Sequence, residues 1–188
     1  MKKYRIEDVV GGLCSIRDAD FSVDNVYTYL SDTPVDVDSI SRYLFWNREF
    51  YTRNLVYKDE RFEMLVICWE RGQASAVHDH SDQKCWMTVP VGRLQGQNFK
   101  IEEIDESRSF CKLKETQNFE LSDCLAAKVE LEEPIHQVLN LAQYDERAVS
   151  IHIYSKPYDH CRSFCRETNT FSTVQLSYNS ISGEICRR

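Results

Sequence analysis

Hydrophobic and polar residues follow two different patterns along this chain. In the first part, apolar residues recur at intervals of three and four, as in Val23–Leu30 and Ser39–Glu49. This spacing places the apolar side chains on one face of a helix, so residues 1–48 are predicted to be largely helical. Asp38 or Ser39 has the short polar side chain that caps a helix N-terminus.

The rest of the chain has the sequence pattern of a β protein, with short β-branched and aromatic runs between turn residues. Many short strands without intervening helices favour a sandwich or barrel, here from about residue 50 to 188. The charged segment Lys100–Glu120 is predicted to be an irregular excursion at one sheet edge. The predicted strands are Tyr51–Tyr57, Phe62–Glu70, Ala76–His80, Cys85–Leu94, Cys124–Leu131, His136–Leu141, Ala148–Tyr154 and Phe171–Tyr178.

The segment Ala148–Tyr154 alternates strictly between apolar and hydrogen-bonding residues. Because successive side chains of a strand point to opposite faces, this strand has one apolar and one polar face. A polar face of this kind suits either solvent or a polar cavity. The apolar face holds Val149, Ile151 and Ile153, and the polar face holds Ser150, His152 and Tyr154.

Length and charge limit the class of protein. The 188 residues fit one domain, and the net charge of −7 argues against nucleic-acid or anionic-membrane partners, which need a basic surface. If this acidic protein binds a carboxylate, a positively charged side chain must lie in the binding site. Lys2 and Lys3 are not followed by the apolar stretch of a signal peptide, and no segment is apolar enough to span a bilayer. We therefore expect a cytoplasmic monomer.

The eight cysteines are expected to be reduced thiols, because the chain is long enough to fold without disulfides. The pair Cys161 and Cys165 is weak support for zinc, since no second pair lies near it. The cysteines are Cys14, Cys68, Cys85, Cys111, Cys124, Cys161, Cys165 and Cys186.

Histidines provide the candidate metal ligands. His78 and His80 are two residues apart, so both imidazoles can project from one face of a strand, and a barrel can bring His136 beside them. Imidazole suits zinc, copper, iron and nickel. The alternative is a surface strand that binds no metal.

Glycine spacing around these histidines resembles the first motif of the cupins. Gly72 precedes His78 by six positions, and Gly92 follows Cys85 by seven. Cys85 stands where the usual cupin has a glutamate ligand, and His136 begins a partial second motif. The resemblance implies a cupin jelly-roll barrel that has lost its carboxylate ligand and keeps three histidines.

The loss of the carboxylate affects the chemistry. Three neutral imidazoles leave a dipositive metal with its full charge, and such a site favours a soft anionic donor such as a thiolate. Three histidines with an open fourth position are also typical of catalytic zinc, so the ligand set alone does not identify the metal.

Several further blocks, in order and with suitable separations, resemble cysteine dioxygenase, and the animal type in particular. The likeness covers roughly Tyr51 to Cys161. The blocks are Tyr51-Thr52-Arg53-Asn54, Cys68-Trp69, Val77-His78-Asp79-His80, Cys85, and Ser150-Ile151-His152-Ile153-Tyr154-Ser155.

This resemblance implies a cofactor, two substrates and a product. One Fe(II) per chain would be bound by the histidine triad His78, His80 and His136. L-cysteine would chelate it through thiolate and amine, O₂ would bind beside the sulfur, and cysteine sulfinic acid would form. Arg53, helped by Tyr51, would pair with the substrate carboxylate, which suits the planar guanidinium.

The same resemblance implies supporting roles on the polar strand face. Tyr154 would donate a hydrogen bond to bound oxygen or substrate, His152 would orient Tyr154, and Ser150 would hold His152. Cys85 would form a thioether with Tyr154. One departure from the family is Ser155-Lys156-Pro157, where members commonly have Ser-Pro-Pro with a cis bond before the first proline.

Other interpretations stay open. Arg53 favours a substrate with a carboxylate over cysteamine, and Cys85 is unusual for an enzyme acting on 3-mercaptopropionate. A zinc or nickel cupin with isomerase or hydrolytic activity is a further alternative, as is a non-catalytic metal-binding cupin. Taken singly, Arg53 would more often form a surface ion pair. Tyr51 and Cys85 would be core residues, and Trp69 is expected in the core or behind the site.

Overall fold

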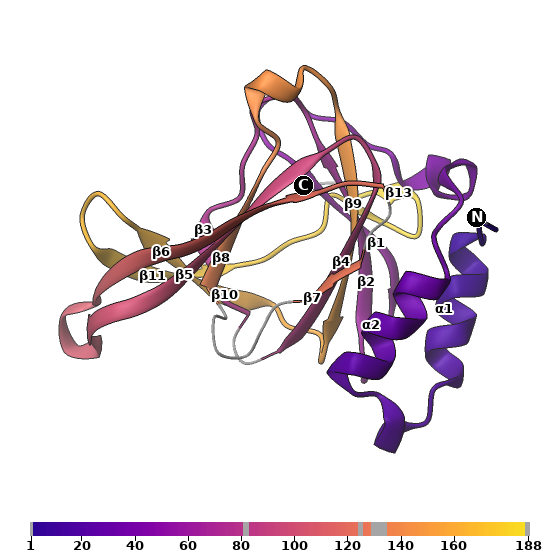
Figure 1. Ribbon diagram of the computed structural model, residues 1–188, viewed down its shortest axis with the longest axis horizontal. Coiled ribbons are helices and arrows are strands. Elements are labelled where there is room, and N and C mark those ends of the chain that lie inside the picture. Colours follow the sequence, from indigo (N-terminus) through magenta and orange to yellow (C-terminus); the bar gives the residue numbers. More distant parts are fainter. Residues whose placement is uncertain (1, 81–82, 124–125, 129–134, 187–188) are drawn as a thin grey trace.

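The computed structural model describes residues 2–80, 83–123, 126–128 and 135–186. A small helical layer precedes a β barrel, as the sequence predicts (Figure 1). The helical layer holds α1 (Ile6–Ser15) and α2 (Val23–Asp32), and it also holds two 3₁₀ helices, η1 (Asp18–Asp20) and η2 (Val37–Tyr43).

The helix predicted over Ser39–Glu49 is wrong in extent and type. A short 3₁₀ helix, η2, takes its place, and its cap is Asp36, which accepts from the backbone N–H of Asp38. The Ser39 hydroxyl accepts from the N–H of Ile6 and donates to the carbonyl of Asp36. Side-chain bonds to the backbone of this kind compete with regular helix, so the segment forms a compact turn instead.

Thirteen strands follow within the described residues, joined in part by η3 (Glu106–Arg108) and η4 (Ala142–Tyr144). The strands are β1 (Thr52–Lys58), β2 (Glu63–Trp69), β3 (Val77–His78), β4 (Lys84–Val91), β5 (Leu94–Asp105), β6 (Phe110–Leu121), β7 (Ala126–Lys128), β8 (Ile135–Leu139), β9 (Ala148–Ser155), β10 (His160–Cys165), β11 (Thr170–Gln175), β12 (Ser180–Ile181) and β13 (Glu184–Ile185).

The strands form two sheets that face each other (Figure 1). The first sheet has the order β13-β12-β1-β2-β9-β4-β7. The second has the order β10-β11-β6-β5-β8-β3, and it closes on itself because β3 pairs with both β8 and β10. This arrangement confirms the prediction of a mostly β barrel with short N-terminal helices.

Strand β9 lies in the middle of the first sheet and has the two faces that its alternation predicts. Val149, Ile151 and Ile153 are buried in one hydrophobic cluster with α1, α2 and η2 on the outer face of the sheet. Tyr154 belongs to a second cluster, inside the barrel, together with Cys85 and residues of β2. The polar face of β9 is therefore turned into the interior of the barrel and away from solvent.

The prediction of an irregular segment at Lys100–Glu120 is wrong. Strands β5 and β6 form a long hairpin whose pairs run from Leu94↔Leu121 to Asp105↔Phe110. The hairpin projects from the barrel on the side opposite to the helices (Figure 1). The backbone ladder satisfies its polar groups while solvent covers much of its surface, so charged side chains are compatible with a regular strand.

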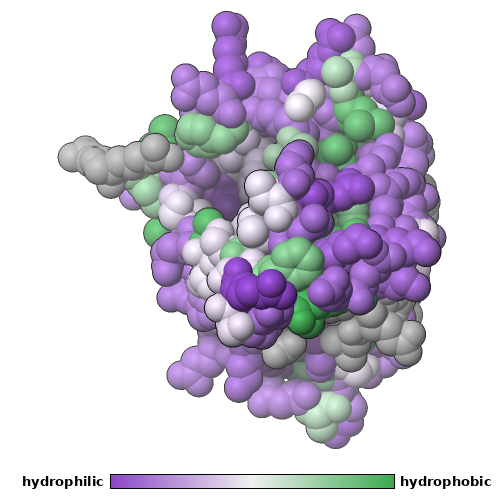
Figure 2. Space-filling view, turned by 90° about the vertical axis from the view of Figure 1, so that its left-hand side faces the viewer, coloured by the Kyte–Doolittle hydropathy of each residue, from purple (hydrophilic) through white to green (hydrophobic). Residues whose placement is uncertain are grey.

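Figure 2 shows the molecule from the side of this hairpin, where the surface is mainly hydrophilic and hydrophobic side chains form small, separate areas. Among the described residues, no helix is both long and apolar enough to cross a membrane. The seven described cysteines are free thiols, in agreement with the prediction. Cys124 and much of the strand predicted over Cys124–Leu131 lie outside the described residues, and β7 covers its middle.

Candidate metal centre

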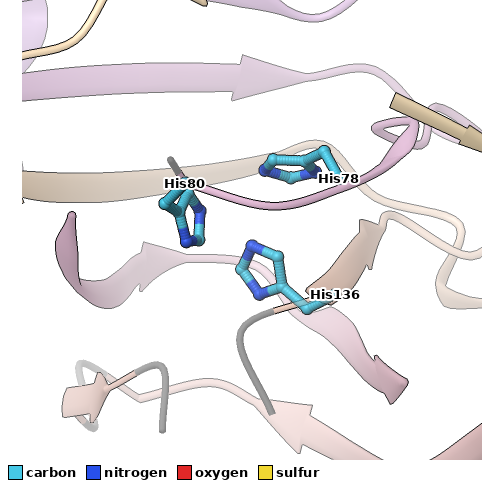
Figure 3. Close-up of side chains that lie close together, drawn as sticks. All are labelled: His78, His80 and His136. Atoms are coloured by element: carbon cyan, nitrogen blue, oxygen red, sulfur yellow. The ribbon is translucent and has the colours of Figure 1, made fainter. Parts of the chain in front are cut away.

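Three histidine side chains converge inside the barrel, and they are the three that the sequence singles out (Figure 3). His78 and His136 are paired residues of β3 and β8, while His80 follows β3 after one residue. The ring centroids lie 5.1 Å apart for His78–His80, 4.8 Å for His78–His136 and 4.7 Å for His80–His136. One ligand atom from each residue lies within 4.8 Å of the others.

His80 lies outside a strand, which corrects the prediction of a strand over Ala76–His80. Asp79, between the two ligands, is buried and turned toward β10. Its carboxylate accepts from the backbone N–H of Arg162 at 2.9 Å and from the Arg162 Nε at 2.6 Å. Because Asp79 is tied to β10, His78 and His80 both face the interior.

The donor set fits a metal ion. His78 Nδ1 lies 2.9 Å from the carbonyl of Ala76, which leaves Nε2 as the available lone pair. Both ring nitrogens of His80 are buried without a hydrogen-bond partner among the described residues. Buried polar groups are normally paired, so these nitrogens indicate a missing ligand.

The histidines are kept neutral, as metal ligation requires. Burial lowers the pKa of His80 and of His136 well below the usual value, and neighbouring histidines lower both further. Burial also lowers the pKa of His78. Three neutral imidazoles are therefore ready to ligate one cation.

A chain of hydrogen bonds on the inner face of the first sheet leads to this centre. Ser150 Oγ lies 2.9 Å from His152 Nε2, and His152 Nδ1 lies 3.0 Å from the Tyr154 hydroxyl oxygen. At the far end, Trp69 Nε1 donates to Ser150 Oγ at 2.9 Å. The Tyr154 ring lies 5.5 Å from the His80 ring, so the chain ends beside the three histidines.

Cys85 stands directly opposite Tyr154 in the register of β4 and β9. Both side chains are buried in the cluster inside the barrel. Burial raises the pKa of the Cys85 thiol, so it stays protonated at neutral pH. The cysteine therefore lies opposite the phenol, and the ligand group that converges among the described residues consists of the three histidines.

Arg53 of β1 provides a cation near the histidines. Its Nε and Nη2 are buried, and within the part of the chain that the structure describes they have no hydrogen-bond partner. Although burial lowers the pKa of Arg53, neighbouring tyrosines and Glu63 raise it, and the net shift is upward. Tyr51 stacks on Trp69 with ring centroids 4.5 Å apart, on the same side of the barrel. A buried, charged guanidinium with two nitrogens left unsatisfied by the described residues is suited to an anion.

The sequence reasoning missed Tyr158, which is buried at the same centre. Its ring lies 5.0 Å from that of Tyr154 and 6.1 Å from that of His80. Tyr158 follows β9 in the turn to β10, where no alternation marks the direction of a side chain. The bond Ser155–Lys156 in that turn is cis.

Most of the chain is similar to one family of known proteins. A family model described as cysteine dioxygenase type I matches residues 9–167. Cysteine dioxygenase type 1 of Danio rerio is 29% identical over 191 residues, which covers 98% of this chain and 90% of that protein. The protein of the same name from Rattus norvegicus is 30% identical over 138 residues, 71% of this chain and 64% of its own length.

Among solved structures, an uncharacterized conserved protein with a double-stranded beta-helix domain from Klebsiella pneumoniae matches 73% of this chain and 96% of its own. The identity is 14% and the TM-score is 0.46. The family match over most of the chain agrees with the mostly β barrel and with the cluster of three histidines inside it. The chain therefore belongs to the cysteine dioxygenase type I family.

Proposed function

We propose that this protein oxidises the thiol of L-cysteine with O₂ to cysteine sulfinic acid, with one Fe(II) held by His78, His80 and His136. The observation that carries the proposal is a cluster of three neutral histidines, two of them buried, near the Arg53 guanidinium, whose buried Nε and Nη2 have no hydrogen-bond partner among the described residues. Membership of the cysteine dioxygenase family supports the choice of substrate.

The chain supplies no carboxylate ligand within this cluster of described residues. A dipositive ion held by neutral imidazoles keeps its charge, and a substrate thiolate can neutralise part of it. When bound, Fe(II) supplies the redox chemistry that activates O₂. Zinc has no redox chemistry, so the same ligand set with zinc would suit hydrolysis and not oxidation of sulfur.

Arg53 binds and orients the substrate carboxylate. Its fork of N–H groups matches the two carboxylate oxygens, and burial strengthens the pair because little water screens it. Tyr51 completes the same side of the pocket and is fixed by its stacking on Trp69. A substrate held at its carboxylate presents the amine and thiol to the histidine cluster.

Tyr154 donates a hydrogen bond to the substrate or to oxygen. Burial raises the pKa of Tyr154 well above its usual value, and Tyr158 and Cys85 raise it further, so the phenol keeps its proton. His152 and Ser150 hold the phenol oxygen in place through their hydrogen bonds.

The second candidate substrate is 3-mercaptopropionate. It also has a carboxylate that Arg53 could bind, but unlike cysteine it has no amine.

The test is metal analysis of protein purified without oxygen, followed by O₂ uptake with different thiols. We expect one iron per chain and about one O₂ consumed per cysteine, with cysteine sulfinic acid as product. Cysteamine should react poorly because it has no carboxylate. Faster turnover of 3-mercaptopropionate than of cysteine would transfer the assignment to that substrate, and a metal-loaded protein that oxidises no thiol would refute the proposal.

Cys85 and Tyr154 are proposed to form a thioether during turnover. The thiol and the ring each lose one hydrogen atom as the carbon–sulfur bond forms, and O₂ accepts the two hydrogens to give hydrogen peroxide. Their opposed positions in β4 and β9 support this bond. A fixed phenol loses rotamer freedom and is held ready for its hydrogen bond.

Mass spectrometry before and after exposure to iron, cysteine and air tests the thioether. A fraction of the chains should become lighter by about 2 Da, with the two peptides linked in a digest. Cys85→Ser should remove the linked peptide, and Cys161→Ser, which alters another buried thiol of the same cluster, should keep it. Wild-type protein without linked peptide after many turnovers would exclude the bond.

A further inference from the structure

The hydrogen bonds that end at Tyr154 can run in either of two directions, and the direction decides what Tyr154 can do. In one, the Tyr154 hydroxyl donates its hydrogen bond to His152, so the phenol proton is not available to the metal centre. In the other, His152 donates to the phenol oxygen, and the phenol proton is free to point at the centre. The heavy-atom positions alone allow both, because a neutral imidazole carries its proton on either nitrogen.

Trp69 distinguishes the two directions. An indole N–H can only donate, so the 2.9 Å contact makes Ser150 Oγ an acceptor. Ser150 is fully buried, and among the described residues its hydroxyl is hydrogen-bonded only to Trp69 and His152. If His152 Nε2 also donated to Ser150, the serine proton would be buried without an acceptor, which is unfavourable.

Once Ser150 is an acceptor from Trp69, the position of each further proton in this series of hydrogen bonds is determined. Ser150 donates to His152 Nε2, so the single proton of the neutral imidazole is on Nδ1. Burial lowers the pKa of His152 to about 3, which agrees with a neutral ring. Nδ1–H then donates to the phenol oxygen of Tyr154 at 3.0 Å. All three bonds point the same way, and such chains polarise and strengthen one another.

We propose that Trp69 is a positioning residue whose indole N–H sets the direction of the chain from Ser150 through His152 to Tyr154. The phenol oxygen accepts from within the protein, and the phenol proton is left for a ligand at the three histidines. The use of that proton in thiol oxidation rests on the proposed function, whereas the direction of the hydrogen bonds does not.

The tautomer of His152 reports this direction. We would label histidine with ¹⁵N, load the protein with diamagnetic Zn(II), and assign His152 by its loss in His152→Asn. Wild-type protein should have His152 protonated on Nδ1. Trp69→Phe keeps a ring to stack on Tyr51 but removes the donor, and the Nε2–H tautomer should increase several-fold.

Trp86→Phe is the matched control. Trp86 is buried on the outer face of the same sheet, and its indole donates to the carbonyl of Val23 at 2.9 Å. The variant loses an indole bond of equal length outside the chain of hydrogen bonds, so the His152 tautomer should not change. A change in Trp86→Phe as large as that in Trp69→Phe would mean that packing, and not the N–H, controls the tautomer.

Two results would overturn the proposal: wild-type His152 protonated on Nε2, or Trp69→Phe with an unchanged tautomer. If Trp69→Phe does not fold, benzothienylalanine in place of tryptophan gives the same test, because sulfur replaces the N–H in a side chain of nearly the same shape. The measurement requires no turnover. An inactive protein with the expected tautomers would therefore refute the proposed function alone, and an active protein with the opposite tautomer would refute the role of Trp69 alone.

Discussion

Replacing His136 with alanine is expected to abolish both metal retention and thiol oxidation. His136 lies on β8, paired with His78 of β3, and supplies the third ring of the cluster, so its loss leaves two of the three ligands. Changes to groups that merely support a metal ligand weaken binding by about 10–100-fold, so loss of a ligand should cost more. Iron content after gel filtration and O₂ uptake with cysteine measure the two effects.

His160→Ala is the control for this variant. His160 is an exposed histidine of β10 whose Nδ1 lies 2.8 Å from the Asp159 carboxylate, outside the cluster. It should keep full iron content and activity. His136→Ala with a normal iron content and normal turnover would remove His136 from the site and leave the buried, unpaired nitrogens of His80 without an explanation.

Local periodicity explains why much of the site is predictable. The alternation of β9 places Ser150, His152 and Tyr154 on one face, and that face is inside the barrel because the other one is apolar and packs on the helices. The direction of each side chain follows from a period of two. These positions need no knowledge of the tertiary structure beyond which face is buried.

The parts that could not be predicted depend on contacts between distant segments or on backbone without a period. Trp69 and Ser150 are 81 positions apart, so their hydrogen bond exists only in the folded barrel. Tyr158 lies in the connection between β9 and β10, where nothing in the sequence gives the direction of the side chain. The β5–β6 hairpin was not predicted because its strands are largely exposed and rich in charged residues. Buried strands have apolar residues at such positions, and it is this pattern that identifies a strand in the sequence.

The second large effect is expected at Arg53. Truncating one member of a buried, hydrogen-bonded charge pair costs about 2–5 kcal/mol, so Arg53→Ala should lower kcat/KM for cysteine by a factor of roughly 30 to 5,000. The loss arises because the substrate carboxylate would enter a buried site without a cation. Cysteamine has no carboxylate, so its slow oxidation should change by less than about tenfold. Steady-state O₂ uptake with both thiols measures the difference.

Two variants separate the guanidinium's geometry from its charge and from a general effect on folding. Arg53→Lys keeps the charge but loses the two-pronged geometry, and it should fall between the wild type and Arg53→Ala. Arg147→Ala removes a half-exposed arginine whose partner is Glu70, and it should leave kcat/KM unchanged. An equal loss on cysteine and cysteamine in Arg53→Ala, with a lowered Tm, would mean that Arg53 serves the fold. If Arg53→Ala impairs only the oxidation of cysteine and its Tm is unchanged, the guanidinium acts on the substrate carboxylate. Cysteine has that carboxylate and cysteamine lacks it.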